Sequence, residues 1–307
     1  MKGHFPIYNI SSLTDVNEDD ILVSRFGPYL DIHKNLSSAH RHNFYHIVLF
    51  TEGEGSHHID FTKYQVEPYQ IYFMIPGQVH SWSFTKPVDG YIVNFSAAFF
   101  QSFLLNPNFL DGFAFFSGFA DEQVIAIPPE HQASVSGLFE GIIAERLTTQ
   151  AMGADMIRSL LLQLLIKISR LKTGDGSPAK VSYNDTLLRN YKKLIDQNYR
   201  TFRLPKDYAA LLYITPNHLN SLCNDLLGIP AGELIRNRVV LEAKRLLVNR
   251  NVPVSEIAHE LNFTDNSYFS RFFKKQAGVT PEEFRKKTLL YQEKNGIETR
   301  SERTLSV

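Results

Sequence analysis

Residues 258–275 read AHELNFTDNSYFSRFFKK, and this stretch decides the fold of the C-terminal part of the chain. An earlier block, residues 209–224, reads AALLYITPNHLNSLCN, and its first alanine stands 49 residues before that of the later block. With one inserted residue near Asp265, apolar and glycine positions fall into register: Leu219 with Phe269, Leu222 with Phe272, and Gly228 with Gly278. Each block therefore predicts a helix, a tight turn and a second helix.

Tyr213 and Asn262 stand where each tight turn begins. That position favours left-handed backbone, which asparagine adopts more readily than tyrosine. Thr215 followed by Pro216 predicts the start of one second helix, and Thr264-Asp265 offers caps for the other. Helical spacing predicts these core positions in the two second helices: Leu219, Leu222, Leu226, Phe269, Phe272 and Phe273.

The remaining faces of the two second helices are polar. Asparagine can bond adenine edges, arginine can bond guanine edges, and lysine and serine suit phosphates. A plain helical bundle with a solvated face is the alternative, but two such units in tandem, joined by one helix over 234–247, favour DNA binding. The predicted DNA-binding residues are Asn217, His218, Asn220, Ser221, Asn224, Asn266, Ser267, Tyr268, Ser270, Arg271, Lys274 and Lys275.

Charge is distributed unevenly along a chain whose net charge is zero. Residues 1–183 hold 12 basic and 18 acidic residues, a net of −6, whereas residues 184–307 hold 20 basic and 14 acidic, a net of +6. Lys and Arg neutralise phosphates, so the second half is the one expected to meet a polyanion. A net charge of +6 is modest for residues 184–307, so it supports DNA binding less strongly than the repeated helix-turn-helix pattern does.

Residues 184–287 resemble the DNA-binding domain of the AraC family of bacterial regulators. The resemblance rests on Leu241–Leu247 and Ser267–Lys275, followed by Gly278–Pro281 and Phe284-Arg285. Asn262 departs from the glycine that is frequent in the family at this position. The resemblance implies that residues 217–224 and 266–275 hold two recognition helices, which enter successive major grooves on one face of the DNA.

The N-terminal half shows a different pattern. Short apolar strands separated by Gly and Pro over about 20–95 predict a sandwich or barrel, and the region resembles a cupin barrel. Helical periodicity follows over about 96–172, where residues 131–170 carry two apolar faces: one can cover the barrel, and the other either pairs with a second subunit or is buried in the same chain. We expect an α+β multidomain protein with a cupin-like domain over 1–172, a linker over 173–183, an all-α domain with two helix-turn-helix units over 184–288, and a polar tail over 289–307.

Histidines form a second constellation in the barrel region. In metal-binding cupins, two histidines one residue apart, a nearby carboxylate and a later histidine hold one metal. The resemblance places His40, His42 and His80 at the histidine positions, with His46 where the glutamate is expected. A histidine on a half-buried strand is more often a hydrogen-bonded packing residue, so we expect neither a metal nor another cofactor.

A barrel lined by aromatic side chains and a few polar groups is a reasonable pocket for a small molecule, although it is also what any small β-barrel core looks like. The candidate effector-binding residues, if their side chains point inward, are His42, Tyr45, His46, Tyr72, His80, Trp82 and Tyr91.

The sequence therefore predicts a regulator of transcription rather than an enzyme, with double-stranded DNA and a small effector as partners. The family resemblance adds an activating role, RNA polymerase and a homodimer. Single Cys223, the lack of an apolar run long enough for a bilayer and the lack of a signal-peptide core favour the cytoplasm, with no membrane partner. The alternatives are a metal-dependent cupin enzyme with a DNA-binding tail, and a constitutive DNA-binding protein whose barrel only dimerises.

Overall fold

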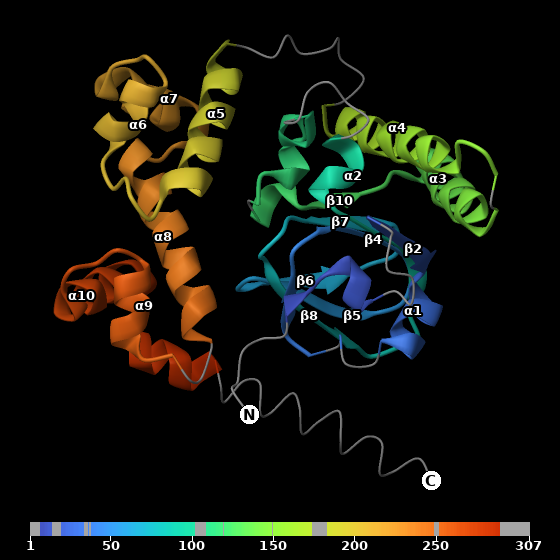
Figure 1. The fold of residues 1–307 in the computed structure, drawn as a ribbon, viewed down its shortest axis with the longest axis horizontal. Coiled ribbons are helices and arrows are strands. Elements are labelled where there is room, and N and C mark those ends of the chain that lie inside the picture. The colour runs from blue at the N-terminus through green and yellow to red at the C-terminus, as the bar shows by residue number, and fades with distance from the viewer. Residues whose placement is uncertain are drawn as a thin grey trace. The chain divides into compact units, whose positions relative to one another are not determined.

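The computed structural model describes residues 7–13, 20–33, 36, 38–101, 109–118, 120–148, 150–173, 183–248 and 252–288. The chain divides into two compact units between Pro178 and Ala179, a point inside the predicted linker (Figure 1). Most of that linker and the predicted polar tail lie outside the described residues. The first unit is rich in β-sheet and the second is helical, which confirms the predicted fold class.

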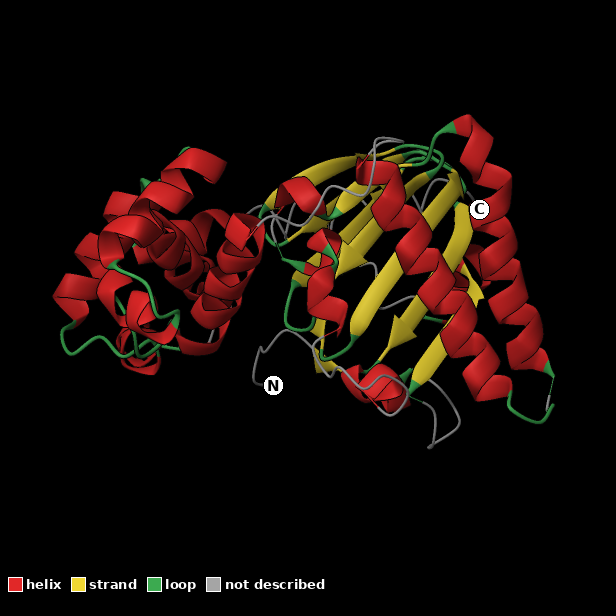
Figure 2. Cartoon of the chain, turned by 90° about the horizontal axis from the view of Figure 1, so that it is seen from above, coloured by secondary structure: helices red, strands yellow, loops and turns green. Residues whose placement is uncertain are grey.

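Two five-stranded sheets build the N-terminal unit (Figure 2). Every neighbouring pair of strands is antiparallel except β1 and β3. The first sheet holds, in spatial order, β1 (Ile7–Tyr8), β3 (His40–His42), β8 (Val79–Phe84), β5 (Gly55–Ile59) and β6 (Thr62–Val66). The second holds β10 (Val124–Ala126), β7 (Gln70–Met74), β4 (Tyr45–Glu52), β9 (Asp89–Phe95) and β2 (Ile21–Arg25).

The second sheet is buried on both faces because successive side chains of a strand point to opposite sides. In β4, Val48 and Phe50 join a core shared with Trp82 and Ile59 of the first sheet. Their neighbours in β4 belong to a different core, which also contains Phe139 from the helical segment. The sequence over β4 therefore reads as one continuous apolar run.

Helices cover the outer face of the second sheet (Figure 2). They are α2 (Ala97–Gln101), α3 (Pro129–Leu147) and α4 (Gly153–Thr173), with short 3-10 helices at Phe109–Gly112, Ala114–Phe116 and Ala120–Glu122. Both apolar faces predicted over 131–170 bury most of their residues in the core between these helices and the sheet. Met156 is the exception, because half of its surface is exposed. The structure adds α1 (Phe26–Ile32), a 3-10 helix at Ile10–Ser12 and strand β10, none of which was expected.

A polar network ties α3 to the sheet. Arg25 of β2 donates hydrogen bonds to Asp89 of β9 and, at 3.0 Å, to Glu140 of α3. Tyr91 donates to the same Glu140 carboxylate at 2.7 Å and stacks on Phe139 with ring centroids 5.1 Å apart. Charge-assisted bonds joined to ring packing fix where this helix crosses the strands.

The C-terminal unit is built entirely of helices in its described residues. They are α5 (Tyr183–Asn198), α6 (Pro205–Leu211), α7 (Pro216–Leu227), α8 (Ala231–Leu247), α9 (Val254–Glu260) and α10 (Asn266–Ala277), followed by helical residues 281–288. The pairs α6–α7 and α9–α10 form the two predicted helix-turn-helix units, and α8 is the predicted connecting helix. None of the described helices is both long and apolar enough to cross a membrane.

The two tight turns have the same backbone. Tyr213 and Asn262 both adopt left-handed conformations, with φ of 56° and 59°. The next residue closes each turn: Ile214 N donates to Ala209 O at 3.0 Å, and Phe263 N donates to Ala258 O at 2.8 Å. This pattern, in which the residue after the left-handed position bonds five residues back, is a Schellman motif. It confirms the internal repeat at the level of single hydrogen bonds.

Helix starts follow the sequence signals. The Thr215 side chain accepts from His218 N at the start of α7, and Asp265 rather than Thr264 caps α10. Two of the predicted core positions were wrong. Leu226 is 41% exposed, whereas Cys223, which was not predicted, is fully buried. Phe272 is only half-buried.

Candidate functional site

The polar face of α7 is open to solvent. Asn217, His218, Asn220, Ser221 and Asn224 are all exposed, while Leu219 and Leu222 hold the helix against the core from the other side. The Asn220 side-chain oxygen accepts from Ala231 N at 3.2 Å, so this residue also holds the start of α8. The face carries hydroxyl, amide and imidazole groups and no cationic Lys or Arg, which suits neutral bonds to base edges or phosphates.

The corresponding face of α10 is cationic. Arg271, Lys274 and Lys275 are exposed, as are Asn266, Ser267 and Tyr268 near the start of the helix. Ser270 is half-buried, which makes it the least accessible of the predicted residues on this helix. Phe269 and Phe273 are fully buried and anchor the helix from behind. The second helices of the two units therefore share one geometry but differ in charge.

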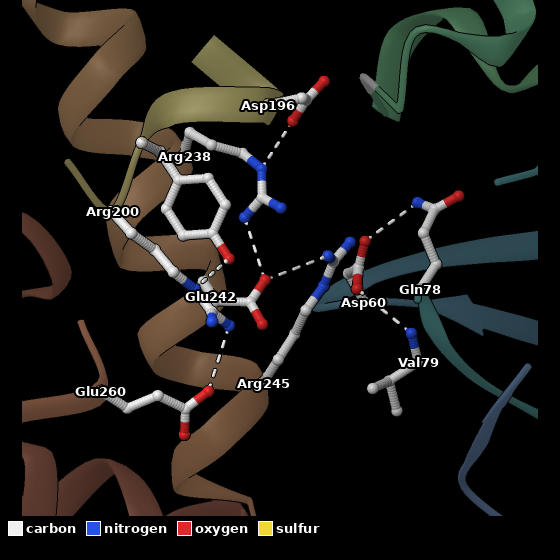
Figure 3. A network of polar contacts seen from close by, with 10 residues as sticks. Asp60, Gln78, Val79, Asp196, Arg200, Arg238, Glu242, Arg245 and Glu260 are labelled. Carbon is white, nitrogen blue, oxygen red and sulfur yellow. Dashed lines mark hydrogen bonds and ion pairs between the residues drawn. The ribbon is translucent and has the colours of Figure 1, made fainter. Parts of the chain in front are cut away.

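Within the C-terminal unit, an ion-pair network runs along α8, which connects the two helix-turn-helix units (Figure 3). Arg238 donates to Asp196 of α5 at 2.6 Å and to Glu242 of α8 at 3.0 Å, and it lies over the Tyr199 ring at 4.1 Å. Arg245 approaches the same Glu242 carboxylate at 3.5 Å. The two arginines hold the pKa of buried Glu242 below its usual value, although burial itself opposes this. The network fixes α5 against the connecting helix.

Five histidines meet at one end of the space between the two sheets of the N-terminal unit. His40 and His42 come from β3, His46 from β4, His57 from β5 and His80 from β8, and each is at most 2% exposed. The ring centroids of His42, His46 and His80 lie 5.0 to 5.2 Å from one another. Trp82 follows His80 on the same face of β8, with ring centroids 4.8 Å apart. We call these five imidazoles and the Trp82 indole the histidine cage.

Hydrogen bonds fix the proton on three of these rings. Nδ1 of His40 lies 2.8 Å from Ser38 O, and Nδ1 of His42 lies 2.9 Å from Phe44 O. A carbonyl only accepts, so each of these Nδ1 atoms carries the hydrogen and the Nε2 atom of a neutral ring is a bare acceptor. His46 Nδ1 bonds the Asn94 side-chain oxygen at 2.6 Å in the same way.

Several buried polar atoms of the cage have no hydrogen-bond partner in the part of the chain that the structure describes. They are Nε2 of His42, His46 and His80, Nδ1 of His57, and Nε1 of Trp82. An unpaired buried polar atom is costly, so a group of them calls for a ligand or ordered water. His57 Nε2 and His80 Nδ1 satisfy one another at 3.2 Å.

Burial keeps the cage uncharged. Removal from water lowers the pKa of His40 to about 4 and that of His42 to about 3. It also lowers the pKa of His46, His57 and His80 well below the ordinary value, with repulsion from neighbouring imidazoles acting in the same direction. At neutral pH the cage therefore offers lone pairs and N–H groups but no positive charge.

The structure brings five of the seven candidate effector residues to the interior between the sheets: His42, His46, Tyr72, His80 and Trp82. It corrects the other two. Tyr45 stacks on Phe95 beneath the 3-10 helices, and Tyr91 packs under α3, because both alternate to the outer face of the second sheet. The sequence analysis missed His57. Strand alternation places it on the same face as apolar Ile59, and that pattern could have indicated that it points inward.

The four histidines that the cupin resemblance singles out as metal candidates, His40, His42, His46 and His80, are all in the cage. In the described part of the chain, no group of three or more histidine, cysteine, aspartate or glutamate side chains is arranged to hold a metal ion. The donor set lacks the carboxylate of the metal-binding cupin pattern, because His46 stands where the glutamate is expected.

Family models match both units. The model described as "AraC-like ligand binding domain" matches residues 26–166, and the one described as "Helix-turn-helix domain" matches residues 208–287. The first contains the histidine cage, and the second contains α7 and α10.

Similar proteins include an uncharacterized HTH-type transcriptional regulator, YijO, from Escherichia coli, which is 30% identical over 105 residues. That match covers 34% of this chain and 37% of the relative, so it spans little more than a third of YijO. The HTH-type transcriptional activator RhaR from Cronobacter sakazakii is 22% identical over 255 residues, covering 82% of this chain and 88% of the relative.

Among solved structures, ToxT from Vibrio cholerae matches with 13% identity and a TM-score of 0.42, covering 86% of this chain and 96% of that one. The two family models, one for each unit, and a relative aligned along most of its length agree with the geometry of the tandem helix-turn-helix. The chain belongs to the AraC family of transcriptional regulators.

Proposed function

We propose that this regulator binds DNA sequence-specifically through α7 and α10, that a small molecule held at the histidine cage controls it, and that it activates transcription. The observation that carries the DNA-binding proposal is the pair of exposed polar faces, which are backed by buried residues and follow identical turns. RhaR, a relative aligned along most of its length, is named an activator, which supports an activating role.

We assign different tasks to the residues of α10. Arg271 is exposed on the helix face away from buried Phe269 and Phe273, where a guanidinium can bond a guanine edge with two hydrogen bonds. Lys274 and Lys275 lie in the last turn, where a point charge suits phosphates. The other proposed contacts, on both helices, supply neutral hydrogen bonds.

Replacing Arg271 with alanine should lower the affinity for the specific site by about 5- to 150-fold, the effect of about 1–3 kcal/mol per base contact, and leave random DNA nearly unaffected. Lys274→Ala is the matched control: it should weaken binding to both DNAs and reduce the salt slope by about one. Fluorescence anisotropy with specific and random duplexes at several salt concentrations separates these results. Equal losses on both DNAs for Arg271→Ala would refute the base-reading role.

The unpaired atoms of the cage point to the chemistry of its ligand. The bare Nε2 atoms of His42 and His46 can only accept, while Trp82 Nε1 can only donate. A hydroxyl group both donates and accepts, so a neutral molecule with several hydroxyls satisfies both kinds of atom. A carboxylate would bring its oxygens against imidazole lone pairs in a site without positive charge. We therefore propose a neutral, hydroxyl-bearing effector.

A neutral polyol of the right shape should bind and raise the unfolding midpoint of the N-terminal unit, whereas the carboxylic acid of the same skeleton should not. At a concentration of about 100 times Kd the gain is about 2.7 kcal/mol. Trp82 is the sole tryptophan and lies in the cage, so its emission reports binding and unfolding of this unit directly. A panel in which only carboxylates shift the midpoint would contradict the proposed chemistry.

The N-terminal unit should lose stability in acid. The folded-state pKa of each cage histidine lies below the ordinary 6.5, so the unfolded chain binds protons first as pH falls through 6.5. His42 alone, with a pKa of about 3, should cost about 1.4 kcal/mol per pH unit below 6.5, and this loss ends near its folded pKa. Urea unfolding followed by Trp82 emission should show a steep fall between about pH 7 and pH 5. An unchanged midpoint would mean that the histidines are not held neutral.

The homodimer, the contact with RNA polymerase and the cytoplasmic location remain predictions, which the family resemblance and the DNA target support. Two measurements distinguish the proposed function from its two alternatives. A metal-dependent enzyme requires stoichiometric metal in the purified protein, which elemental analysis measures. A constitutive DNA-binding protein requires that no effector changes its affinity for DNA.

A further inference from the structure

Arg203 links the two helix-turn-helix units outside the connecting helix. It lies in the loop between α5 and α6, just before the first unit begins. Its guanidinium donates a hydrogen bond to Leu261 O at the end of α9, in the second unit. The same guanidinium lies over the Phe263 ring, 4.6 Å from its centroid. One side chain from the entrance of the first unit therefore touches the turn of the second at two points.

The carbonyl that Arg203 contacts belongs to the turn that orients α10. Leu261 is the last residue before left-handed Asn262, and a carbonyl at the end of a helix has no partner within that helix. Phe263 closes the turn and packs on α10, with its ring centroid 5.2 Å from that of Phe269 and 5.3 Å from that of Phe272. Arg203 therefore contacts Phe263, whose packing helps to set the angle at which α10 leaves the turn.

A neighbouring arginine makes a weaker link of the same kind. Arg200 bonds Glu260 of α9 at 3.1 Å (Figure 3), but the two side chains are 48% and 40% exposed. Exposed ion pairs contribute little. Arg203 differs because it is half-buried, and burial lowers the pKa of its guanidinium. A cation withdrawn from water needs compensating partners, and here the Leu261 carbonyl and the Phe263 ring supply them.

We propose that Arg203 is a positioning residue, which holds α10 at a fixed place relative to α7 so that the protein binds only DNA whose two half-sites have one set spacing. The inference rests on the proposed sequence-specific binding and adds a determinant that touches no base. One inserted base pair moves the second half-site by about 3.4 Å along the DNA and turns it by about 34°. A rigid pair of recognition helices cannot follow this change, whereas a pair joined by α8 alone can adapt.

The test starts from a duplex selected from a random library by the full-length protein, into which one base pair is inserted between the half-sites. Wild-type protein should bind the inserted duplex at least about tenfold more weakly, the effect of losing one or more base contacts. Arg203→Met keeps the length and the packing on Phe263 but removes the hydrogen bond. This variant should bind the selected site more weakly and reduce the ratio between the two duplexes to about twofold.

Two further variants separate positioning from other roles. Arg189→Met removes the same charge from α5 and should leave the ratio at its wild-type value. Arg203→Lys keeps the charge but lacks the planar guanidinium that bonds the carbonyl and stacks on the ring together, and it should lower the ratio partway. Circular dichroism checks whether each variant folds. If Arg203→Met does not fold, Arg203→Lys tests the proposal in its place.

If Arg203 contacted a phosphate instead, Arg203→Met would weaken both duplexes equally and lower the salt slope by about one, so the ratio would stay unchanged. That result would overturn the proposal and leave sequence-specific binding intact. Failure to select any site would overturn both.

Discussion

Both helix-turn-helix units depend on one backbone constraint, the left-handed residue that ends their first helix. That conformation lets the chain turn sharply while the amide of the left-handed residue and the amide of the next residue still bond carbonyls of the helix. This conformation costs a non-glycine residue about 1–2 kcal/mol. Tyr213 adopts it although its side chain is 96% exposed and gains little by packing. The buried anchors of the second helices offset this cost, and they determine which polar face α7 and α10 expose.

A second constraint shapes the N-terminal unit. Its second sheet lies between the helices on one side and the first sheet on the other, so alternate side chains of each strand enter separate cores. Polar residues on the inner face are removed from bulk water, so their hydrogen-bond partners must come from the protein or from a bound ligand. This explains why the five imidazoles stay uncharged and why three of their rings leave an Nε2 atom without a partner among the described residues. A ligand that forms hydrogen bonds with these buried atoms would gain binding energy from a site of low dielectric constant.

Much of this was predictable from sequence because it depends on local pattern. The 49-residue repeat located both turns and the second helix of each unit and aligned Gly228 with Gly278, and the structure confirms the turns and helices and places a left-handed glycine at the end of each second helix. The division of polar and apolar faces on α10 followed from its period. Histidines of the cage could be named because their spacing resembled a cupin motif.

What could not be predicted depends on which side of a strand faces which core. Residues 45–50 are almost uniformly apolar, so the sequence does not distinguish Tyr45, which faces the helices, from His46, which faces the cage. Strand β10 follows a phenylalanine-rich segment that reads as helical, and it pairs with β7, more than 50 residues earlier, through a contact that no local pattern encodes. The Arg203 contact with Leu261 is equally non-local: it joins two units that the repeat treats as separate.

The central claim, that the C-terminal unit reads DNA, is tested most directly by binding of the purified full-length protein to the DNA upstream of its own gene, at two salt concentrations and against random competitor. We expect specific binding that weakens steeply with salt, because lysines and arginines release counterions from phosphates. Absence of specific binding by the full-length protein, and also by residues 184–307 alone, would contradict the account.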